Sequence, residues 1–274
     1  MRVTWLWGAG AVLAGLYVVP GLLLYLAQGG FVFPAPRVDR ALLDRAAAEV
    51  GARTVDLRAE DGVPLYGWYR RATGERAVLF FHGNAEVVAD RVDLQELLLA
   101  RGWDVLVVAY RGYPGSGGRP SEAGLRLDAR AAWRWLEGEG LAPERVVLHG
   151  KSLGGGVAAM LAEEVDPAAL VLESTFLSVA EVAGEVFPIY PTRLLVRHRF
   201  DTRGRADRIH CPVLVVHGDA DEVIGVRHGQ GLAERFEGAS YVEVPGGTHG
   251  ESYPVEYGQV REPYLELLER VARR

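Results

Sequence analysis

The most informative stretch of the chain lies at residues 146–156 and runs Val146-Val147-Leu148-His149-Gly150-Lys151-Ser152-Leu153-Gly154-Gly155-Gly156. Its first three residues are apolar and favour a buried strand, and a helical pattern follows over residues 155–163. The pattern Gly-x-Ser-x-Gly therefore falls between a strand and a helix. A sharp turn of this kind lifts the serine side chain above the sheet, and its crowded backbone accepts only glycine at the two flanking positions. Ser152 is the candidate nucleophile.

A serine hydroxyl needs a base, and a group that orients the base, before it can attack a carbonyl group. The pattern around Ser152 is weak without them, because a chain with 34 glycines also forms glycine-rich turns by chance. Two later stretches supply both, and they run His217-Gly218-Asp219-Ala220-Asp221 and Gly246-Gly247-Thr248-His249-Gly250. Each follows an apolar run, and loops at the carboxyl ends of parallel strands converge. We predict His249 as the base and Asp221 as the acid.

Each of these two assignments has an alternative. Asp219 shares a loop with Asp221, but it is better described as a turn residue whose side chain bonds nearby backbone amides. A histidine in a surface loop is the alternative for His249. Glycine on both sides of His249, and its position after the last predicted strand, favour the catalytic role instead.

Acyl transfer also requires hydrogen-bond donors for the negative oxygen of the intermediate. One is expected to be the backbone N–H of Leu153, directly after the nucleophile, where the following helix begins. The second is expected in the loop after an earlier strand, within Phe80-Phe81-His82-Gly83-Asn84-Ala85. We predict the N–H of Asn84 as this donor, and we expect His82 to shape the turn.

The rest of the chain predicts an α/β fold. A hairpin is expected from Thr54–Leu57 and Leu65–Tyr69, which the turn-prone residues 60–62 separate. Short apolar runs then alternate with helical patterns, and the runs are 78–81, 105–109, 146–148, 170–172, 213–216 and 241–244. Continuous apolar strands are typical of a parallel sheet covered by helices on both faces. We therefore predict a mostly parallel, doubly wound sheet with an antiparallel hairpin at its edge.

The amino terminus differs from the rest of the chain. No charged residue occurs from Val3 to Ala27, which exceeds the ~20 residues that a helix needs to cross a bilayer. We predict a single-pass membrane anchor through residues 3–27. A cleaved signal peptide is the alternative, but its apolar region usually has only ~7–15 residues. The flanking charges leave the side of the membrane open.

These patterns divide the chain into three parts. Residues 1–28 form the membrane anchor or signal segment, residues 29–53 a connector, and residues 54–274 the catalytic domain, with a short lid at 174–209. Seven apolar lid residues are expected either to wall an acyl site or to pack in the core, namely Phe176, Val186, Phe187, Ile189, Tyr190, Leu194 and Leu195.

Composition excludes some functions. The net charge of -6 and the pI near 5.7 leave no basic surplus, so nucleic acid is not expected as a partner. The single cysteine, Cys211, excludes an intramolecular disulfide and a metal site with several cysteines. The oligomeric state stays open.

From about Phe31 to Val271 the chain resembles the α/β-hydrolase superfamily, specifically its membrane-anchored members with a serine aminopeptidase-like hydrolase domain. The resemblance rests on residues 31–34 and on the stretches 82–85, 110–118 and 150–155, with the Asp221 and His249 loops. It implies hydrolysis of ester, thioester or lipid-like acyl substrates without a metal or organic cofactor. It also implies a structural role for Arg111. The chain departs from the family at Glu86-Val87-Val88, which puts the mouth of the pocket in question.

The predicted activity is that of a serine hydrolase, such as a carboxylesterase, thioesterase or lipase-like enzyme. Ser152, His249 and Asp221 would transfer an acyl group from a small-molecule or lipid substrate to the serine and then to water. A serine aminopeptidase-like hydrolase of amides or peptides is one alternative. A non-catalytic, membrane-tethered binding module on the same fold is the other, since a fold does not guarantee activity.

Overall fold

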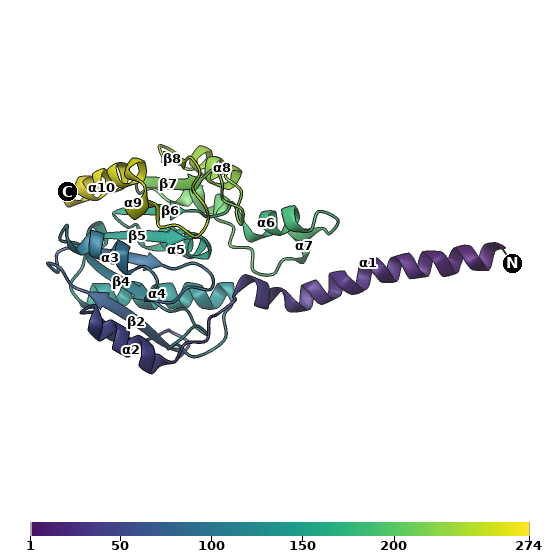
Figure 1. The fold of residues 1–274 in the computed structure, drawn as a ribbon, viewed down its shortest axis with the longest axis horizontal. Coiled ribbons are helices and arrows are strands. Elements are labelled where there is room, and N and C mark those ends of the chain that lie inside the picture. Colours follow the sequence, from purple (N-terminus) through teal and green to yellow (C-terminus); the bar gives the residue numbers. More distant parts are fainter. Residues whose placement is uncertain (1, 274) are drawn as a thin grey trace.

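The computed structural model describes residues 2–273, and their side chains from residue 15 on. Its centre is an eight-stranded sheet (Figure 1). The strands are β1 (Arg53–Arg58), β2 (Pro64–Arg70), β3 (Ala77–Phe81), β4 (Asp104–Val108), β5 (Val146–Lys151), β6 (Ala169–Glu173), β7 (Val213–Gly218) and β8 (Ser240–Val244). They lie in the order β1-β2-β4-β3-β5-β6-β7-β8. β2 runs antiparallel to both β1 and β4, and the other neighbours are parallel, so the predicted hairpin forms one edge of a mostly parallel sheet.

Helices cover the sheet in two groups, and the members of each group contact one another. Their bounds are α2 (Arg40–Glu49), α3 (Val92–Leu99), α4 (Glu122–Gly138), α5 (Leu153–Val165), α8 (Arg227–Arg235), α9 (Tyr253–Glu256) and α10 (Gly258–Ala272), with 3₁₀ turns η1 (Pro143–Arg145) and η2 (Arg203–Arg208). α4 packs on α5, and both α5 and α8 contact η2, whereas α9 contacts α3 and α10. Every residue of β3, β4, β5 and β6 is buried, as expected for strands covered on both faces. The predicted fold class is confirmed.

The strand order places a crevice at the carboxyl end of the sheet. The chain passes from β3 outwards to β4 and then returns to β5 on the opposite side of β3. The loops after β3 and β5 therefore leave the sheet in different directions, and ligands of open α/β sheets bind at such a point. The loop after β3 carries Asn84, and the turn after β5 carries Ser152.

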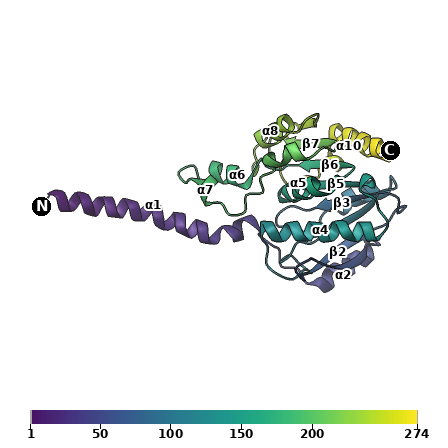
Figure 2. The same cartoon turned by 180° about the vertical axis from the view of Figure 1, so that it is seen from behind.

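A long amino-terminal helix, α1 (Arg2–Val32), projects away from the domain (Figures 1 and 2). Its window Gly15–Val32 has a mean hydropathy of 1.5 and is not buried by the rest of the chain. The helix is long and apolar enough to cross a membrane, a test that a signal sequence also passes. Part of the predicted span, residues 3–14, lies outside the residues whose side chains are described.

α1 ends later than the sequence predicts. Gly29 and Gly30, expected in the connector, are helical, and the N–H of Phe33 still donates to the carbonyl oxygen of Gly29 at 3.0 Å. Pro34 then stops the helix, because proline has no N–H and disfavours a helical conformation of the preceding residue. Phe33 is buried, with its ring 5.1 Å from the ring of His198. The chain therefore enters the domain directly after the end of α1.

The segment 174–209, predicted as a lid, contains α6 (Val179–Val186), α7 (Thr192–Leu195) and η2. In both ribbon views α6 and α7 lie beside α1 and away from the centre of the sheet (Figures 1 and 2). The hydroxyl of Tyr17 in α1 donates to the carbonyl oxygen of Ile189 at 2.8 Å. The segment 174–209 therefore contacts α1 as well as the catalytic domain.

Candidate active site

Ser152 occupies a strained turn between β5 and α5. Its backbone has φ +52° and ψ −119°, a conformation that residues other than glycine rarely adopt. A Cβ atom at Gly150 would overlap the carbonyl oxygen of Gly154, and a Cβ atom at Gly154 would overlap the carbonyl oxygen of Phe81. The two glycines of the pattern are thus required by contact with neighbouring backbone. The N–H of Ser152 donates to the carbonyl oxygen of Glu173 at 2.9 Å, which fixes the turn against β6.

Three side chains from three loops form a chain of hydrogen bonds. The Oγ atom of Ser152 lies 3.1 Å from Nε2 of His249, and Nδ1 of His249 lies 2.8 Å from Oδ2 of Asp221. These loops follow β5, β7 and β8 at the same edge of the sheet. The structure thus brings together the three residues that the sequence singled out, in the geometry that proton transfer from the hydroxyl to the imidazole requires.

The Asp221 carboxylate is fully buried, and its hydrogen bonds are satisfied. Oδ1 accepts the backbone N–H groups of Val223 at 2.9 Å and Ile224 at 2.8 Å, while Oδ2 faces His249. The ring of His217 lies 3.4 Å from the same Oδ2. Burial by itself would raise the pKa of Asp221, but the hydrogen bonds to His217, His249 and Ile224 outweigh it and hold the pKa well below its usual range. Asp221 is therefore an anion, and its Oδ2 accepts a hydrogen bond from the protonated Nδ1 of His249.

Asp219 has a different environment in the same loop. Its side chain is exposed, and Oδ1 accepts the backbone N–H of Gly246 at 2.6 Å. Asp219 therefore joins the loop after β7 to the loop after β8 through backbone, while Asp221 contacts the imidazole. The bonded amide lies 27 residues along the chain, so the contact is not the local turn that the sequence suggested.

The loop after β3 presents the Asn84 amide between two bonded neighbours. The N–H of Gly83 donates to Oε2 of Glu86 at 3.0 Å, and the N–H of Ala85 donates to the carbonyl oxygen of Pro34 at 3.1 Å. For the Asn84 N–H, no acceptor is found among the residues that the structure describes. Ala85 adopts a positive φ of 56°, which turns the backbone sharply at this point. The loop thus leaves one amide available for an external oxygen.

The second predicted donor, Leu153, is the first residue of α5. An N–H in the first turn of a helix has no acceptor within that helix, and the helix dipole favours negative charge there. The two loops lie close together, since a Cβ atom at Gly83 would lie only 3.4 Å from the Cβ of Ser152. The Asn84 loop and the first turn of α5 therefore both lie close to the Ser152 side chain.

Glu86, where the chain departs from the family pattern, belongs to a buried cluster of charges. Its Oε1 lies 2.5 Å from the guanidinium of Arg91 and 3.7 Å from the ammonium of Lys151, the residue before the nucleophile. Lys151 donates to the carbonyl oxygen of Glu251 at 2.9 Å, and Arg91 reaches that of Gly250 at 3.4 Å. The cluster connects the Asn84 loop, the serine turn and the His249 loop. Position 86 therefore supports the site through its ion pairs and its bond to the Gly83 amide.

Glu173 at the end of β6 is a second buried acid that sequence analysis did not identify. Its Oε2 lies 2.8 Å from Nε2 of His149, and its Oε1 accepts the N–H of Tyr253 at 3.2 Å. Burial by itself would raise the pKa of Glu173. The hydrogen bond and charge of His149, with Lys151 nearby, outweigh burial and lower the pKa to about 2. A charged residue that closes an otherwise apolar strand is the sequence signal that marks such a group.

The lowered pKa of Glu173 predicts how the free energy of unfolding depends on pH. Because its pKa in the folded state lies below the ordinary 4.5, its stabilising contribution is present above about pH 4.5 and is lost as the pH falls towards 2. We expect Glu173→Gln to lower the free energy of unfolding at pH 7 and to make its decline between pH 4.5 and 2 shallower. Urea unfolding of the full chain in detergent, followed by tryptophan fluorescence, measures both. Glu237→Gln, at an exposed position after α8, is the control, and a wild-type slope in Glu173→Gln would contradict the prediction.

Two further residues singled out in the sequence, His82 and Arg111, make contacts that support the fold. Nδ1 of the buried His82 lies 2.8 Å from the carbonyl oxygen of Gly83, a contact within its own turn. Arg111 contacts Asp128 through Nε at 2.9 Å and Asp61 through Nη1 at 2.6 Å. Neither side chain touches the three residues around Ser152 through these contacts. Among the described residues, no three His, Cys, Asp or Glu side chains are grouped as a metal site.

Comparison with known proteins identifies the family of the chain. The family described as "alpha/beta hydrolase fold" matches residues 76–195. The chain is 31% identical to the alpha/beta hydrolase domain-containing protein WAV2 of Arabidopsis thaliana over 241 residues, which cover 79% of this chain and 78% of WAV2. The chain belongs to the α/β-hydrolase family. Its resemblance to that superfamily is thereby confirmed, while the narrower subgroup of membrane-anchored, serine aminopeptidase-like members stays a prediction.

Two other similarities are informative about this α/β-hydrolase. It is 38% identical to the uncharacterized protein Rv2307c of Mycobacterium tuberculosis over 234 residues, which cover 84% of this chain and 80% of that protein. Among solved structures, the Pyrococcus furiosus esterase Pf2001 superposes with a TM-score of 0.70 at 22% identity, covering 86% of this chain and 98% of the esterase. At that identity the superposition shows a shared fold.

Proposed function

We propose that the protein is a serine hydrolase that cleaves carboxylic esters of small or lipid-like acyl groups. The observation that carries the proposal is the chain of hydrogen bonds from Ser152 through His249 to the buried Asp221. It lies at the carboxyl edge of the sheet, beside two amides suited to an oxyanion. A binding module would have no need for a strained serine aligned with an imidazole at 3.1 Å.

In the proposed reaction, Oγ of Ser152 attacks the ester carbonyl carbon while Nε2 of His249 takes the hydroxyl proton. The carbonyl oxygen becomes an oxyanion, which the N–H groups of Asn84 and Leu153 stabilise. The alcohol leaves with the proton that His249 returns, and the acyl group stays on Ser152. Water then attacks the acyl carbon as His249 takes its proton, and the acid is released as His249 returns that proton to Oγ of Ser152. Asp221 holds the imidazole tautomer and stabilises its cation during both steps.

We favour esters as substrates because the superposed Pyrococcus protein is an esterase. We also propose that α1 anchors the protein in a membrane as a single-pass helix. Its exposed apolar surface and its direct continuation into the buried Phe33 support an anchor that stays attached. Cleavage as a signal peptide is the alternative.

The proposal predicts which substrates the purified full chain turns over. We expect hydrolysis of p-nitrophenyl acyl esters and labelling by a fluorophosphonate probe, with turnover of amino-acid p-nitroanilides at least about a hundredfold slower. Parallel assays of both series in the same detergent measure the ratio. A preference for the anilides would instead support the aminopeptidase-like activity. Absence of both turnover and labelling would refute a serine hydrolase.

A further inference from the structure

The lid is seated on α1 through a specific contact near the middle of the helix. The ring of Tyr190 stacks on the ring of Tyr17 with their centroids 5.0 Å apart. Gly21 makes room for it, because a Cβ atom there would lie 2.7 Å from the Tyr190 ring. The hydroxyl of Tyr17 donates to the carbonyl oxygen of Ile189 at 2.8 Å, and the hydroxyl of Tyr190 donates to that of Tyr17 at 3.1 Å. These bonds satisfy the polar groups of an otherwise apolar contact.

A second contact joins the lid to α1 near the base of the helix. The side chain of Gln28 donates from Nε2 to the carbonyl oxygen of Leu195 at 3.4 Å and accepts the N–H of Arg197 at 2.8 Å through Oε1. The guanidinium of Arg197 lies over the ring of Tyr25, 5.0 Å from its centroid. Residues 17 and 28 are about 16 Å apart along a helix that rises 1.5 Å per residue. The lid therefore follows α1 over three turns.

The position of Tyr17 determines where the lid lies if α1 crosses a bilayer. The apolar window of α1, Gly15–Val32, includes Tyr17 near its start. If this window crosses the hydrocarbon layer, which needs ~20 helical residues, Tyr17 lies within the bilayer. Ile189, hydrogen-bonded to Tyr17, then lies at the same depth.

The surface of the lid suits that position. Val186, Ile189 and Leu194 are 62%, 67% and 79% exposed. On α1, Leu22 and Leu26 are likewise more than half exposed. A water-soluble protein rarely exposes several large apolar side chains on adjoining elements, whereas lipid tails are a favourable environment for them. Core packing, the alternative for the lid residues, therefore does not hold for these three.

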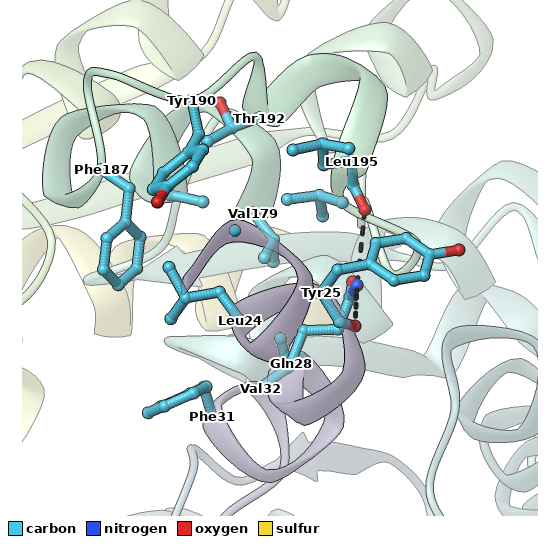
Figure 3. A pocket seen from close by; sticks show the side chains of 13 residues that line it. Leu24, Tyr25, Gln28, Phe31, Val32, Val179, Phe187, Tyr190, Thr192 and Leu195 are labelled. Carbon is cyan, nitrogen blue, oxygen red and sulfur yellow. Dashed lines mark hydrogen bonds between the residues drawn. The ribbon is translucent and has the colours of Figure 1, made fainter. Parts of the chain in front are cut away.

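Between α1 and the lid lies an open groove with a volume of about 110 Å³ (Figure 3). Its walls are largely apolar, and they include Leu24, Phe31, Val179, Ala183, Phe187 and Leu195. Thr192, which also lines the groove, directs its hydroxyl to the carbonyl oxygen of Ala180 at 3.0 Å. Gln28, Tyr190 and Thr192 in the lining are thus hydrogen-bonded to protein partners, and an apolar ligand suits the apolar remainder.

We propose that this groove binds one acyl chain of a bilayer lipid and serves as the tail site for the ester hydrolysis proposed above. The groove lies on the anchor helix at membrane depth, so lipid chains surround it. The chain that leads to the groove starts beside the serine turn, because the hydroxyl of Thr175 donates to the backbone carbonyl oxygen of Ser152 at 2.7 Å. Val179 in the groove wall follows Thr175 by four residues, at most about 14 Å of chain.

The experiment uses the full chain in phosphatidylcholine nanodiscs that contain a phosphatidylcholine with a diazirine in its acyl chain. On illumination, we expect crosslinks to peptides of α1 and of residues 179–196. Ala183→Trp fills the groove and should lower this crosslinking about tenfold, the effect of losing the burial of roughly two methylene groups. Ala48→Trp, at an exposed position of α2, is the matched control and should crosslink as the wild type does.

A second variant, Leu24→Trp, fills the groove from α1 and leaves the catalytic domain unaltered. Hydrolysis is measured in parallel, and both groove variants should lose palmitoyl ester turnover while retaining acetyl ester turnover. Wild-type crosslinking in both groove variants, or crosslinks only elsewhere, would overturn the tail site. Fluorophosphonate labelling of the same samples separates the two proposals: without labelling the hydrolase proposal fails, whereas the crosslinks still decide whether the groove binds an acyl chain.

Discussion

Replacement of Ser152 by alanine is expected to reduce ester hydrolysis about a millionfold, because loss of a serine nucleophile removes the whole covalent pathway. The Oγ atom makes its contact at 3.1 Å with Nε2 of His249, and the backbone bond from the Ser152 N–H to Glu173 does not depend on the side chain. The fold should therefore remain intact. Initial rates with a p-nitrophenyl ester and labelling by a fluorophosphonate probe measure the effect.

The matched control for Ser152→Ala is Ser116→Ala, a serine in the loop after β4 whose hydroxyl donates to the carbonyl oxygen of Ala109 at 2.7 Å. This variant should keep its labelling, because its hydroxyl has no contact with the imidazole. Circular dichroism of both variants tests the fold. Turnover or labelling of Ser152→Ala at more than about one per cent of the wild-type level would mean that another residue is the nucleophile.

Replacement of Asp221 by asparagine is expected to lower the turnover number about ten-thousandfold. An amide at this position would face Nδ1 of His249 with a donor or a neutral acceptor, which favours the wrong tautomer of the imidazole. The bonds that Oδ1 accepts from Val223 and Ile224 would remain, so the loop should keep its position. Steady-state kinetics with a soluble ester provide the measurement.

Asp219→Asn tests the same loop without touching the imidazole. Its oxygen can still accept the N–H of Gly246, and its exposed side chain leaves room for the amide. We expect turnover within a few-fold of the wild type. If Asp219→Asn had the large effect and Asp221→Asn the small one, the acid of the site would be Asp219, contrary to the geometry.

Much of the fold and the three central residues could be predicted from the sequence, because local patterns carry that information. Buried parallel strands are short apolar runs, and their carboxyl ends meet at one edge, so Ser152, Asp221 and His249 could be grouped from their positions alone. Ser152 is flanked by glycines for a steric reason that is itself local. The Asn84 loop could be predicted by the same reasoning, because it comes directly after an apolar strand.

The charged groups that support the site could not be predicted in this way. The ion pairs of Glu86 with Arg91 and Lys151 join loops that are distant in sequence, and no periodicity marks them. The place of Glu173 at the end of an apolar strand is a sequence signal, but no pattern marks its contact with the N–H of Tyr253, 80 residues along the chain. The seat of Tyr190 on Gly21 depends on a close approach between segments 169 residues apart, which only the folded chain reveals.

If α1 anchors the protein in a membrane, as proposed above, the bond from the Ala85 N–H to the carbonyl oxygen of Pro34 has a consequence for release of the domain by proteolysis. A protease that cut within residues 28–32 would release a particle that keeps both Phe33 and Pro34. A cut after residue 37 would leave them behind, and with them the bond from the Ala85 N–H that helps to hold the Asn84 loop. Release from the membrane and weakening of the proposed oxyanion site are therefore separate events, determined by where within about ten residues the chain is cleaved.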